Sequence, residues 1–280
     1  MNAVIDVEPL SPVLAAAVRG IDWRQPVDEA TAQAVRDTFT RYSVLCFPDQ
    51  KLSSEDQVRF ASVFGKADSA FRRPPSQDFA SASTRGVMLV TNIRKDGKAI
   101  GFLPDGEMQF HSDGAHRVPP YRATTLYAIK VTSRGGETLF ANLYKAYETL
   151  SDEMKARLEG LKTRFVYNYD ATSRAGTVED DPRLPSAEHP LVKIHPNSGR
   201  KSLYLSRLMT RNIVGMERAE SDKLLAELFD HAERPELIYA HRWTPGDLVI
   251  WDNRCTNHAR ADFPAEEVRL LRRYTVSEPD

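Results

Sequence analysis

Two imidazoles and a carboxylate lie within six residues of one another in the stretch FHSDGAH, residues 110–116. Side chains on a β-strand alternate between its two faces, so His111 and Asp113 are predicted to point to the same side. Imidazole nitrogens and carboxylate oxygens are both metal-ligating atoms. This pair could therefore occupy two neighbouring positions around a metal ion. Because H-x-D is a common tripeptide, the hypothesis needs a third ligand from another part of the chain.

The best candidate for that third ligand is His258, in the segment DLVIWDNRCTNHAR. We expect a strand at 247–251 and then a turn that contains Asp252 and Asn253, with His258 a few residues further on. Two His and one carboxylate on one side of a metal leave three coordination positions open, which is typical of non-haem Fe(II) oxygenases. A closed site with four protein ligands would instead indicate structural zinc.

His116 is a rival ligand within the first stretch. Its spacing of three residues from Asp113 breaks the alternation expected of a strand, and Gly114 marks the start of a turn. We therefore expect His116 to lie in a loop or in the wall of a pocket, and not to bind the metal.

The elements that must position these residues are predicted to be mostly strands. From about residue 87 the chain consists of short β-rich runs separated by Gly, Pro, Asn and Asp. These runs are VMLV, RATTLYAIKV, ETLF, RFVYNY, LVKIH, SLYLS, ELIYAHRW, GDLVIWDN and LLRRYTV. Many short strands with turns between them are typical of a sandwich, a jelly roll or a barrel.

Helices are expected to flank this β-rich part. Apolar residues at helical spacing predict a helix over 28–43, and a short buried strand follows at 43–47. A second helix is predicted over 52–65, where Ser54 precedes Gln57 by three residues in a capping-box pattern. Later helices are expected around 144–160 and 219–233. The predicted fold class is therefore mostly β with flanking helices.

No repeat and no low-complexity linker divides the chain, so we predict a single domain over residues 1–280 with its β-rich core at about 87–280. Two long polar stretches, at about 66–86 and 170–190, interrupt the strands. Loops of this length in a compact domain are usually lids, binding loops or disordered segments. We predict that they are lids over a site.

Composition excludes several classes of function. The net charge of -1 gives no overall field that would attract nucleic acid or an anionic membrane, so a small molecule is the expected partner. Two Cys in 280 residues do not form a disulfide framework and suit a reducing compartment. We see neither a signal peptide nor an apolar run of the roughly 20 residues that a membrane span requires. A cytoplasmic location is predicted.

Four segments together resemble the taurine dioxygenase / 2,4-dichlorophenoxyacetate dioxygenase (TauD/TfdA) family of Fe(II)- and 2-oxoglutarate-dependent oxygenases. VLCFPDQKLSSEDQVRFASVFG resembles its N-terminal signature, and FHSD its first metal motif. GGETLFANLYKAYETL resembles the segment after that motif, and GDLVIWDNRCTNHA with VRLLRRYTV its C-terminal motif. The resemblance covers nearly the whole chain.

The resemblance implies a fold and a reaction. The fold would be a double-stranded β-helix, which is a cupin-like jelly roll, and this agrees with the strand pattern. His111, Asp113 and His258 would be the iron ligands and the catalytic centre. With Fe(II), the co-substrate 2-oxoglutarate and O2, the enzyme would hydroxylate an organic substrate and release succinate and CO2. The resemblance also implies a homo-oligomer, either a dimer or a tetramer.

The resemblance further implies residues that hold the two organic ligands. Arg269 and Thr138 would bind the distal carboxylate of 2-oxoglutarate, since a guanidinium matches a carboxylate with two parallel hydrogen bonds. Arg273 would meet an anionic group of the substrate. Arg269 and Arg273 would share one face of a strand, and Arg272 would point the other way, toward solvent. The implied substrate is a small anion such as a sulfonate, an aryloxyalkanoate or another carboxylic acid.

The chain departs from the family pattern at Phe110, where relatives often have Trp before the first His. Both residues are large and apolar, so the iron site is unaffected, but we expect a differently shaped pocket wall. A second class of function also stays open. The same triad could serve a non-redox metal-binding jelly roll or a zinc hydrolase, and neither would have a use for Arg269 and Thr138.

Overall fold

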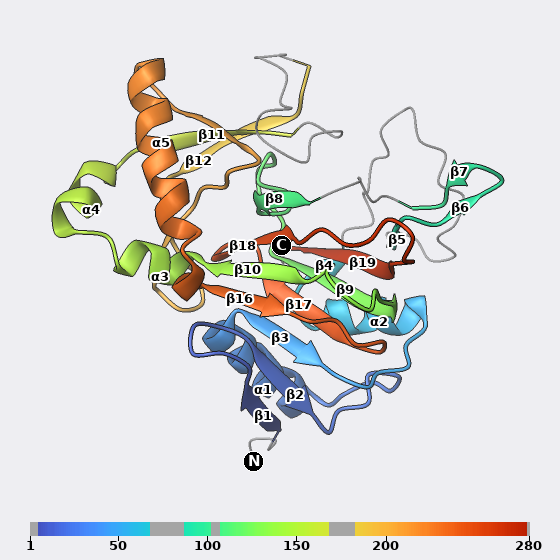
Figure 1. Cartoon of the computed structure of the whole chain (residues 1–280). Helices are drawn as coiled ribbons and strands as arrows, with labels where there is room; N and C mark the ends of the chain where they lie inside the picture. The colour runs from blue at the N-terminus through green and yellow to red at the C-terminus, as the bar shows by residue number, and fades with distance from the viewer. Residues whose placement is uncertain (1–4, 68–86, 102–106, 168–182, 279–280) are drawn as a thin grey trace.

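Two β-sheets form the centre of the computed structural model, which describes residues 5–67, 87–101, 107–167 and 183–278 (Figure 1). We call the larger one the major sheet. Its strand order is β1 (Asp6–Pro9), β2 (Ala16–Arg19), β3 (Val44–Phe47), β17 (Leu248–Asp252), β9 (Ala123–Lys130), β19 (Leu270–Ser277) and β4 (Lys66–Ala67), and β5 (Met88–Thr91) also pairs with β19. The minor sheet has the order β16 (Ile238–His241), β10 (Thr138–Asn142), β18 (Thr256–Arg260) and β8 (Met108–His111).

The two sheets pack against each other through an apolar core. Val249 and Trp251 on β17 belong to the same buried cluster as Phe140 on β10. The ring centroids of Phe140 and Trp251 are 5.4 Å apart. Both faces of β17 are apolar because helices cover the other side of the major sheet, and this explains its continuous hydrophobic sequence.

That outer face is covered by α1 (Glu29–Tyr42) and α2 (Ser54–Ser62), close to the ranges predicted. Asp28 caps α1 by accepting a hydrogen bond from the Thr31 amide at 2.7 Å. The capping box of α2 is one residue earlier than predicted, with Ser53 as N-cap and Asp56 as its partner. Gln57 instead is fully buried, and its amide donates to the major sheet.

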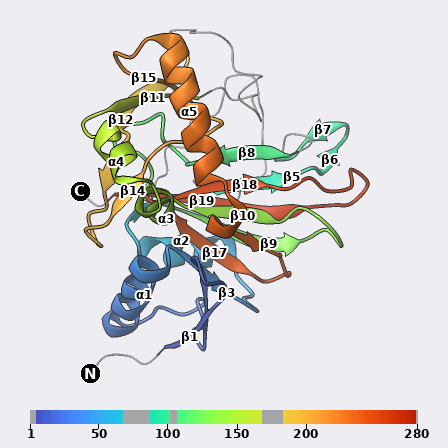
Figure 2. The ribbon, with the colours of Figure 1, turned by 60° about the vertical axis from the view of Figure 1, so that its left-hand side comes forward.

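A second group of elements gathers at the end of the molecule away from α1 (Figures 1 and 2). It contains α3 (Leu143–Glu148), α4 (Asp152–Leu158), α5 (Arg218–Ala232), the 3-10 helix η2 (Pro235–Leu237) and the strands β11 (Lys162–Val166), β12 (Ser186–Pro190), β13 (Val192–Ile194), β14 (Lys201–Leu203) and β15 (Thr210–Ile213). The helix expected at 144–160 is two helices, because Ser151 starts a new one by accepting from the Met154 amide. A short hairpin, β6 (Arg94–Lys95) and β7 (Lys98–Ala99), completes the elements.

The predicted lid stretches are described only in part. Residues 186–190, expected to lie in a loop, form β12 and pair with β11, so the prediction is wrong there. Lys66–Ala67 is the edge strand β4. Residues 183–185 belong to no helix or strand, and 68–86 and 170–182 lie outside the described residues.

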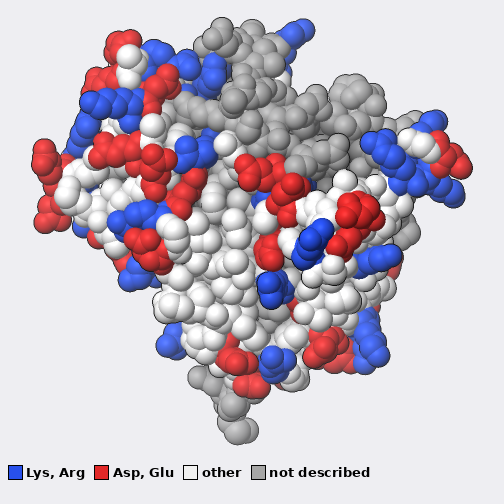
Figure 3. All heavy atoms as spheres, in the orientation of Figure 1, with Lys and Arg blue, Asp and Glu red and all other residues white. Residues whose placement is uncertain are grey.

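The surface carries both signs of charge. In Figure 3 the Lys and Arg side chains are interspersed with Asp and Glu, as the net charge of -1 leads one to expect. Among the helices that the structure describes, none is long and apolar enough to cross a membrane.

Candidate metal centre

Strand pairing brings the two predicted imidazoles together. His111 is the last residue of β8, and it lies directly opposite His258 on the neighbouring antiparallel strand β18. Residues that face each other in this way have their side chains on the same side of the sheet. The two ring centroids are 4.1 Å apart. The 146 intervening residues therefore separate these groups in sequence only.

Asp113 lies in a turn just past β8, not on the strand as predicted. The chain turns at Gly114, which has φ +72°, and a Cβ there would lie 2.5 Å from the Tyr121 ring, so only glycine fits. The carboxylate still reaches the imidazoles. Its Oδ1 is 3.9 Å from His111 Nε2, and its Oδ2 is 3.7 Å from His258 Nε2. One ligating atom from each residue lies within 4.8 Å of the others.

The protonation states suit a metal. Nδ1 of His111 lies 2.9 Å from the carbonyl oxygen of Gln109. An Nδ1–H that donates to this carbonyl leaves the Nε2 lone pair directed at Asp113. Burial lowers the pKa of His111, and burial together with His111 lowers that of His258 to about 3, so both rings are neutral at pH 7. Two neutral imidazoles and one carboxylate fit Fe(II) or a similar divalent ion.

A network of hydrogen bonds fixes Asp113. Arg273 Nη2 is 2.8 Å from Oδ1, and Thr124 Oγ1 donates to Oδ2 at 2.7 Å. Burial alone would raise the pKa of Asp113, but its ion pair with Arg273 outweighs this and holds the pKa well below the usual range. Asn253 completes the network. It accepts from the Asp113 amide at 3.2 Å and from Trp251 Nε1 at 3.1 Å, and it donates to Thr124 Oγ1 at 3.0 Å.

Replacing Asn253 by Ala should therefore damage both the fold and the metal site. The change leaves three buried polar partners without their hydrogen bonds, so we expect a loss of about 2–4 kcal/mol in the free energy of unfolding. Because Asp113 would lose its orientation, affinity for a divalent metal should fall roughly 10- to 100-fold. Urea unfolding and calorimetric Mn(II) titration measure the two effects. Unchanged metal affinity in a folded variant would contradict this role.

Arg269 packs against the chain just before Thr138. A Cβ on Gly136 would be 3.5 Å from Arg269 Nε, so this guanidinium lies against the backbone two residues before Thr138. Arg269 is 3% exposed, and the residues that the structure describes give its guanidinium no hydrogen bond. Thr138 Oγ1 accepts from Trp243 Nε1 at 3.0 Å. Its own O–H is thereby directed away from the indole and can donate to a ligand.

The arginines of β19 differ from the prediction in one respect. Arg273 points inward to Asp113, and Arg272 points to the opposite face, as strand alternation requires. However, Arg272 does not reach solvent and is only 9% exposed. Helix α2 covers that face, so the Arg272 guanidinium donates to Ser54 Oγ and to the carbonyl of Leu52, over the ring of Tyr127.

Two further predictions concern the neighbours of the triad. His116 is not among the clustered ligand atoms, and its ring stacks on Tyr167 with centroids 4.5 Å apart. Phe110 belongs to a cluster with Ala141 and Ala259 on the face of the minor sheet opposite His111. The expectation that Phe110 reshapes the pocket wall is therefore wrong, because its ring points away from the triad.

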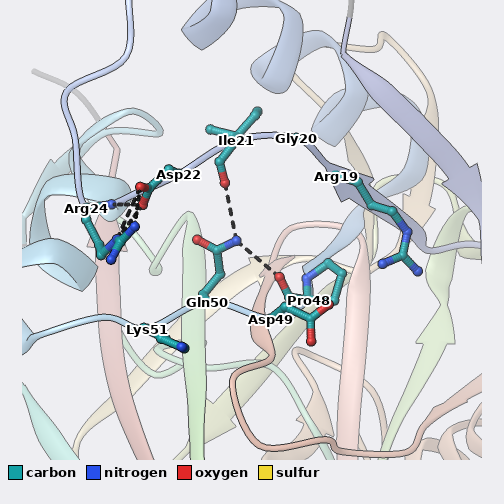
Figure 4. A pocket seen from close by; sticks show the side chains of 9 residues that line it. All are labelled: Arg19, Gly20, Ile21, Asp22, Arg24, Pro48, Asp49, Gln50 and Lys51. Atoms are coloured by element: carbon teal, nitrogen blue, oxygen red, sulfur yellow. Dashed lines mark hydrogen bonds and ion pairs between the residues drawn. The ribbon is translucent and has the colours of Figure 1, made fainter.

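Other features of the described residues are less suited to this chemistry. In the cluster of His195, Asp252 and Cys255, Arg254 already binds Asp252 through two nitrogens. A third cluster contains Cys46, His241 and Asp247, whose carboxylate accepts from the Thr244 amide. A pocket of about 520 Å³ lies between Arg19–Arg24 and Pro48–Lys51 (Figure 4), and none of the predicted site residues lines it.

Residues 6–275 match the protein family described as taurine catabolism dioxygenase TauD, TfdA family. The chain belongs to this family. It is 33% identical to (S)-phenoxypropionate/alpha-ketoglutarate-dioxygenase of Sphingobium herbicidovorans, over 97% of this chain and 94% of the relative. It is also 33% identical to alpha-ketoglutarate-dependent 2,4-dichlorophenoxyacetate dioxygenase of Cupriavidus pinatubonensis, over 96% of each chain.

A solved structure of AAD-2 in complex with Mn(II) and N-oxalylglycine is similar throughout, with a TM-score of 0.83, 32% identity and coverage of 99% of this chain and 98% of that one. The two facing sheets are thus the jelly roll of the TauD/TfdA dioxygenases, as predicted. This TauD/TfdA protein is a 2-oxoglutarate-dependent dioxygenase that uses Fe(II) and O2, and the comparisons support this activity and not the zinc hydrolase or non-redox alternative.

Proposed function

We propose that this dioxygenase hydroxylates a small organic anion, with His111, Asp113 and His258 as its iron ligands. The convergence of these three side chains in one buried cluster is the observation that carries the proposal. Iron, when bound, supplies the redox chemistry in which O2 oxidises 2-oxoglutarate to succinate and CO2 and delivers one oxygen atom to a substrate C–H bond. If the hydroxylated carbon also bears an ether oxygen or a sulfonate, the product can then break apart.

The protein binds and orients 2-oxoglutarate in this proposal. Arg269 offers its planar fork to the distal carboxylate from a buried position, and the Thr138 hydroxyl adds one donor. Trp243 keeps that hydroxyl oriented through its indole N–H. Trp251 and Phe140 close the site on the side of His258, with Trp251 4.6 Å away between ring centroids, and so exclude water there.

Arg273 is the residue proposed to hold the substrate anion. It lies 2.8 Å from Asp113, so an anion that it binds would lie beside the metal centre. Metal binding would neutralise Asp113 and leave more of the Arg273 positive charge to the substrate. The two relatives at 33% identity are named for phenoxypropionate and 2,4-dichlorophenoxyacetate, so aryloxyalkanoates are the first substrate class to test.

Measuring succinate release tests this function. The purified protein, supplied with Fe(II), 2-oxoglutarate and O2, should release succinate in proportion to a chosen aryloxyalkanoate, and a panel of sulfonates and other carboxylic acids identifies the preferred class. Neutral analogues of the best substrate, such as its amide, should be much poorer. Succinate release that no acid in the panel stimulates would refute the substrate class.

Arg273→Gln should act mainly on the organic substrate. We expect KM for the preferred anion to rise roughly 10- to 100-fold, because one charge-assisted contact is lost. Affinity for 2-oxoglutarate should change little. Steady-state kinetics with each compound varied in turn measures both effects, and an equal rise in the two constants would contradict the assignment.

The proposal also includes a cytoplasmic location and a homo-oligomer, either a dimer or a tetramer. Two Cys, both reduced and buried, agree with a reducing compartment. Light scattering coupled to size exclusion gives the oligomeric state directly.

A further inference from the structure

A second group of metal-ligating side chains, separate from the triad, lies between the two sheets. Cys46 is on β3, Asp247 immediately precedes β17 of the same major sheet, and His241 is the last residue of β16 in the minor sheet. One ligating atom of each lies within 4.8 Å of the other two, and none of these residues is more than 5% exposed. A thiol, an imidazole and a carboxylate are the donor types that zinc takes in proteins.

The backbone around Asp247 fixes the position of its carboxylate. The Asp247 amide donates to the carbonyl of Thr244 at 3.0 Å, and the Thr244 amide donates to Asp247 Oδ2 at 2.8 Å. The carbonyl oxygen of Asp247 accepts from the Ala128 amide at 2.8 Å, which ties this turn to β9. A carboxylate can accept several partners, so one amide donor still leaves it able to bind a cation.

The imidazole of His241 has one nitrogen that faces the carboxylate without bonding to it. Its Nδ1 lies 2.9 Å from the Tyr239 hydroxyl oxygen. Its Nε2 lies 3.2 Å from Asp247 Oδ2, but it makes no hydrogen bond with any residue that the structure describes. A buried polar atom without a partner is destabilising. An Nδ1–H that donates to Tyr239 would leave the Nε2 lone pair beside the carboxylate, where a cation would satisfy both.

The thiol of Cys46 supplies the third donor. Burial first, and then the charge of the Asp247 carboxylate, raise the pKa of Cys46 well above its usual range, so the thiol keeps its proton at neutral pH. A thiol that coordinates a metal loses its proton outright. Binding of a divalent ion would therefore release this proton to solvent. The thiolate and the carboxylate would then balance the two positive charges, which lowers the cost of burying the ion.

We propose that Cys46, His241 and Asp247 form a second metal site, which binds Zn(II) and joins the two sheets. Bonds from zinc to its ligands are about 2.0–2.3 Å long, so the ligand atoms lie roughly 3–4 Å apart, and small side-chain movements reach this geometry. A water molecule would fill the fourth position. The soft thiolate favours zinc over the harder ions that carboxylates and carbonyls select. Because its ligands come from β3, β16 and the start of β17, the ion stabilises the packing of one sheet on the other.

Cobalt(II) is the probe that separates this site from the triad. A thiolate bound to Co(II) gives a near-ultraviolet charge-transfer band, and the triad of His111, Asp113 and His258 contains no sulfur. Metal-free protein is titrated with Co(II) without oxygen, both as wild type and as His258→Ala. The band should appear in both proteins, and added Zn(II) should remove it. Zn(II) should also raise the melting temperature of His258→Ala. Absence of the band from the wild type overturns the proposal without any cysteine variant.

The two cysteines of the chain provide a matched pair of variants. Cys46→Ser should lose the Co(II) band and weaken Zn(II) binding more than about 100-fold, because a ligand is lost. In the His258→Ala background it should also abolish the rise in melting temperature with Zn(II). Cys255→Ser replaces the other buried thiol and should keep both signals.

His241→Gln keeps both thiols and tests the site if Cys46→Ser does not fold. It should weaken Co(II) and Zn(II) binding at the thiolate site by a similar factor, and unchanged affinity would overturn the assignment. A band that survives in Cys46→Ser but disappears in Cys255→Ser would place the metal at the cluster of His195, Asp252 and Cys255, and this result also overturns the proposal.

Discussion

Replacing His258 by Ala should abolish metal-dependent turnover and reduce affinity for a divalent metal more than about 100-fold, because loss of a ligand costs more than loss of a residue that merely orients one. In the proposed centre His258 is one of three donors on one side of the metal, so its loss would leave only two protein ligands. The ring is buried against Trp251 and Phe140, so some stability is also lost. Metal content by mass spectrometry, the charge-transfer band with 2-oxoglutarate and succinate release measure the result.

His231→Ala is the matched control for this experiment. His231 lies on α5, and its Nε2 is hydrogen-bonded to the carbonyl of Ala146, outside the triad. The variant should bind metal as the wild type does. An added readout comes from thermal unfolding, since Mn(II) should raise the melting temperature of the wild type and of His231→Ala but not of His258→Ala. If His258→Ala retains stoichiometric metal, His258 is not a ligand.

Replacing Arg269 by Gln should weaken 2-oxoglutarate binding by about 2–5 kcal/mol, or roughly 30- to several-thousand-fold, because the change removes the proposed buried partner of its distal carboxylate. KM for the organic substrate should change far less. Substitution of a buried guanidinium that has no hydrogen bond from the described residues should not lower the stability of the ligand-free protein greatly. Calorimetric titration of the Fe(II)-loaded protein without oxygen gives the affinity.

Arg272→Gln tests whether the effect of Arg269 depends on its position. Arg272 is also buried, three residues further on, but it contacts α2 and Tyr127 on the other face of the major sheet. Its loss should reduce the free energy of unfolding and leave 2-oxoglutarate affinity unchanged. Equal losses of affinity in the two variants would show a general effect of charge and would remove the special role of Arg269.

Much of the triad could be predicted because its members carry a recognisable pattern. The pair His111 and Asp113 suggests a metal by residue type, His258 follows a predicted strand and turn, and the resemblance to the family implies the same three ligands. Strand alternation also determines the direction of the Phe110 ring. Phe110 is adjacent to His111 on β8, so its ring had to point to the opposite face.

Other members of the site could not be found in this way. Trp243 and Thr138 are 105 residues apart, and no sequence motif contains both of them. Arg272 was expected at the surface because nothing near it in sequence indicates that α2, more than 200 residues earlier, covers it. Long-range packing decided each of these cases.

The strand order of the major sheet has a consequence for the biosynthesis of the enzyme. β17 lies between β3 and β9, and β19 lies between β9 and β4, so strands made last fill the middle of a sheet begun early. The segments synthesised last also contain His258, Arg269 and Arg273. A nascent chain that ends before residue 248 therefore lacks two inner strands of the major sheet and contains only His111 and Asp113 of the three proposed ligands. With the proposed ligands, the complete metal site would form only after the last strands of the chain have been synthesised.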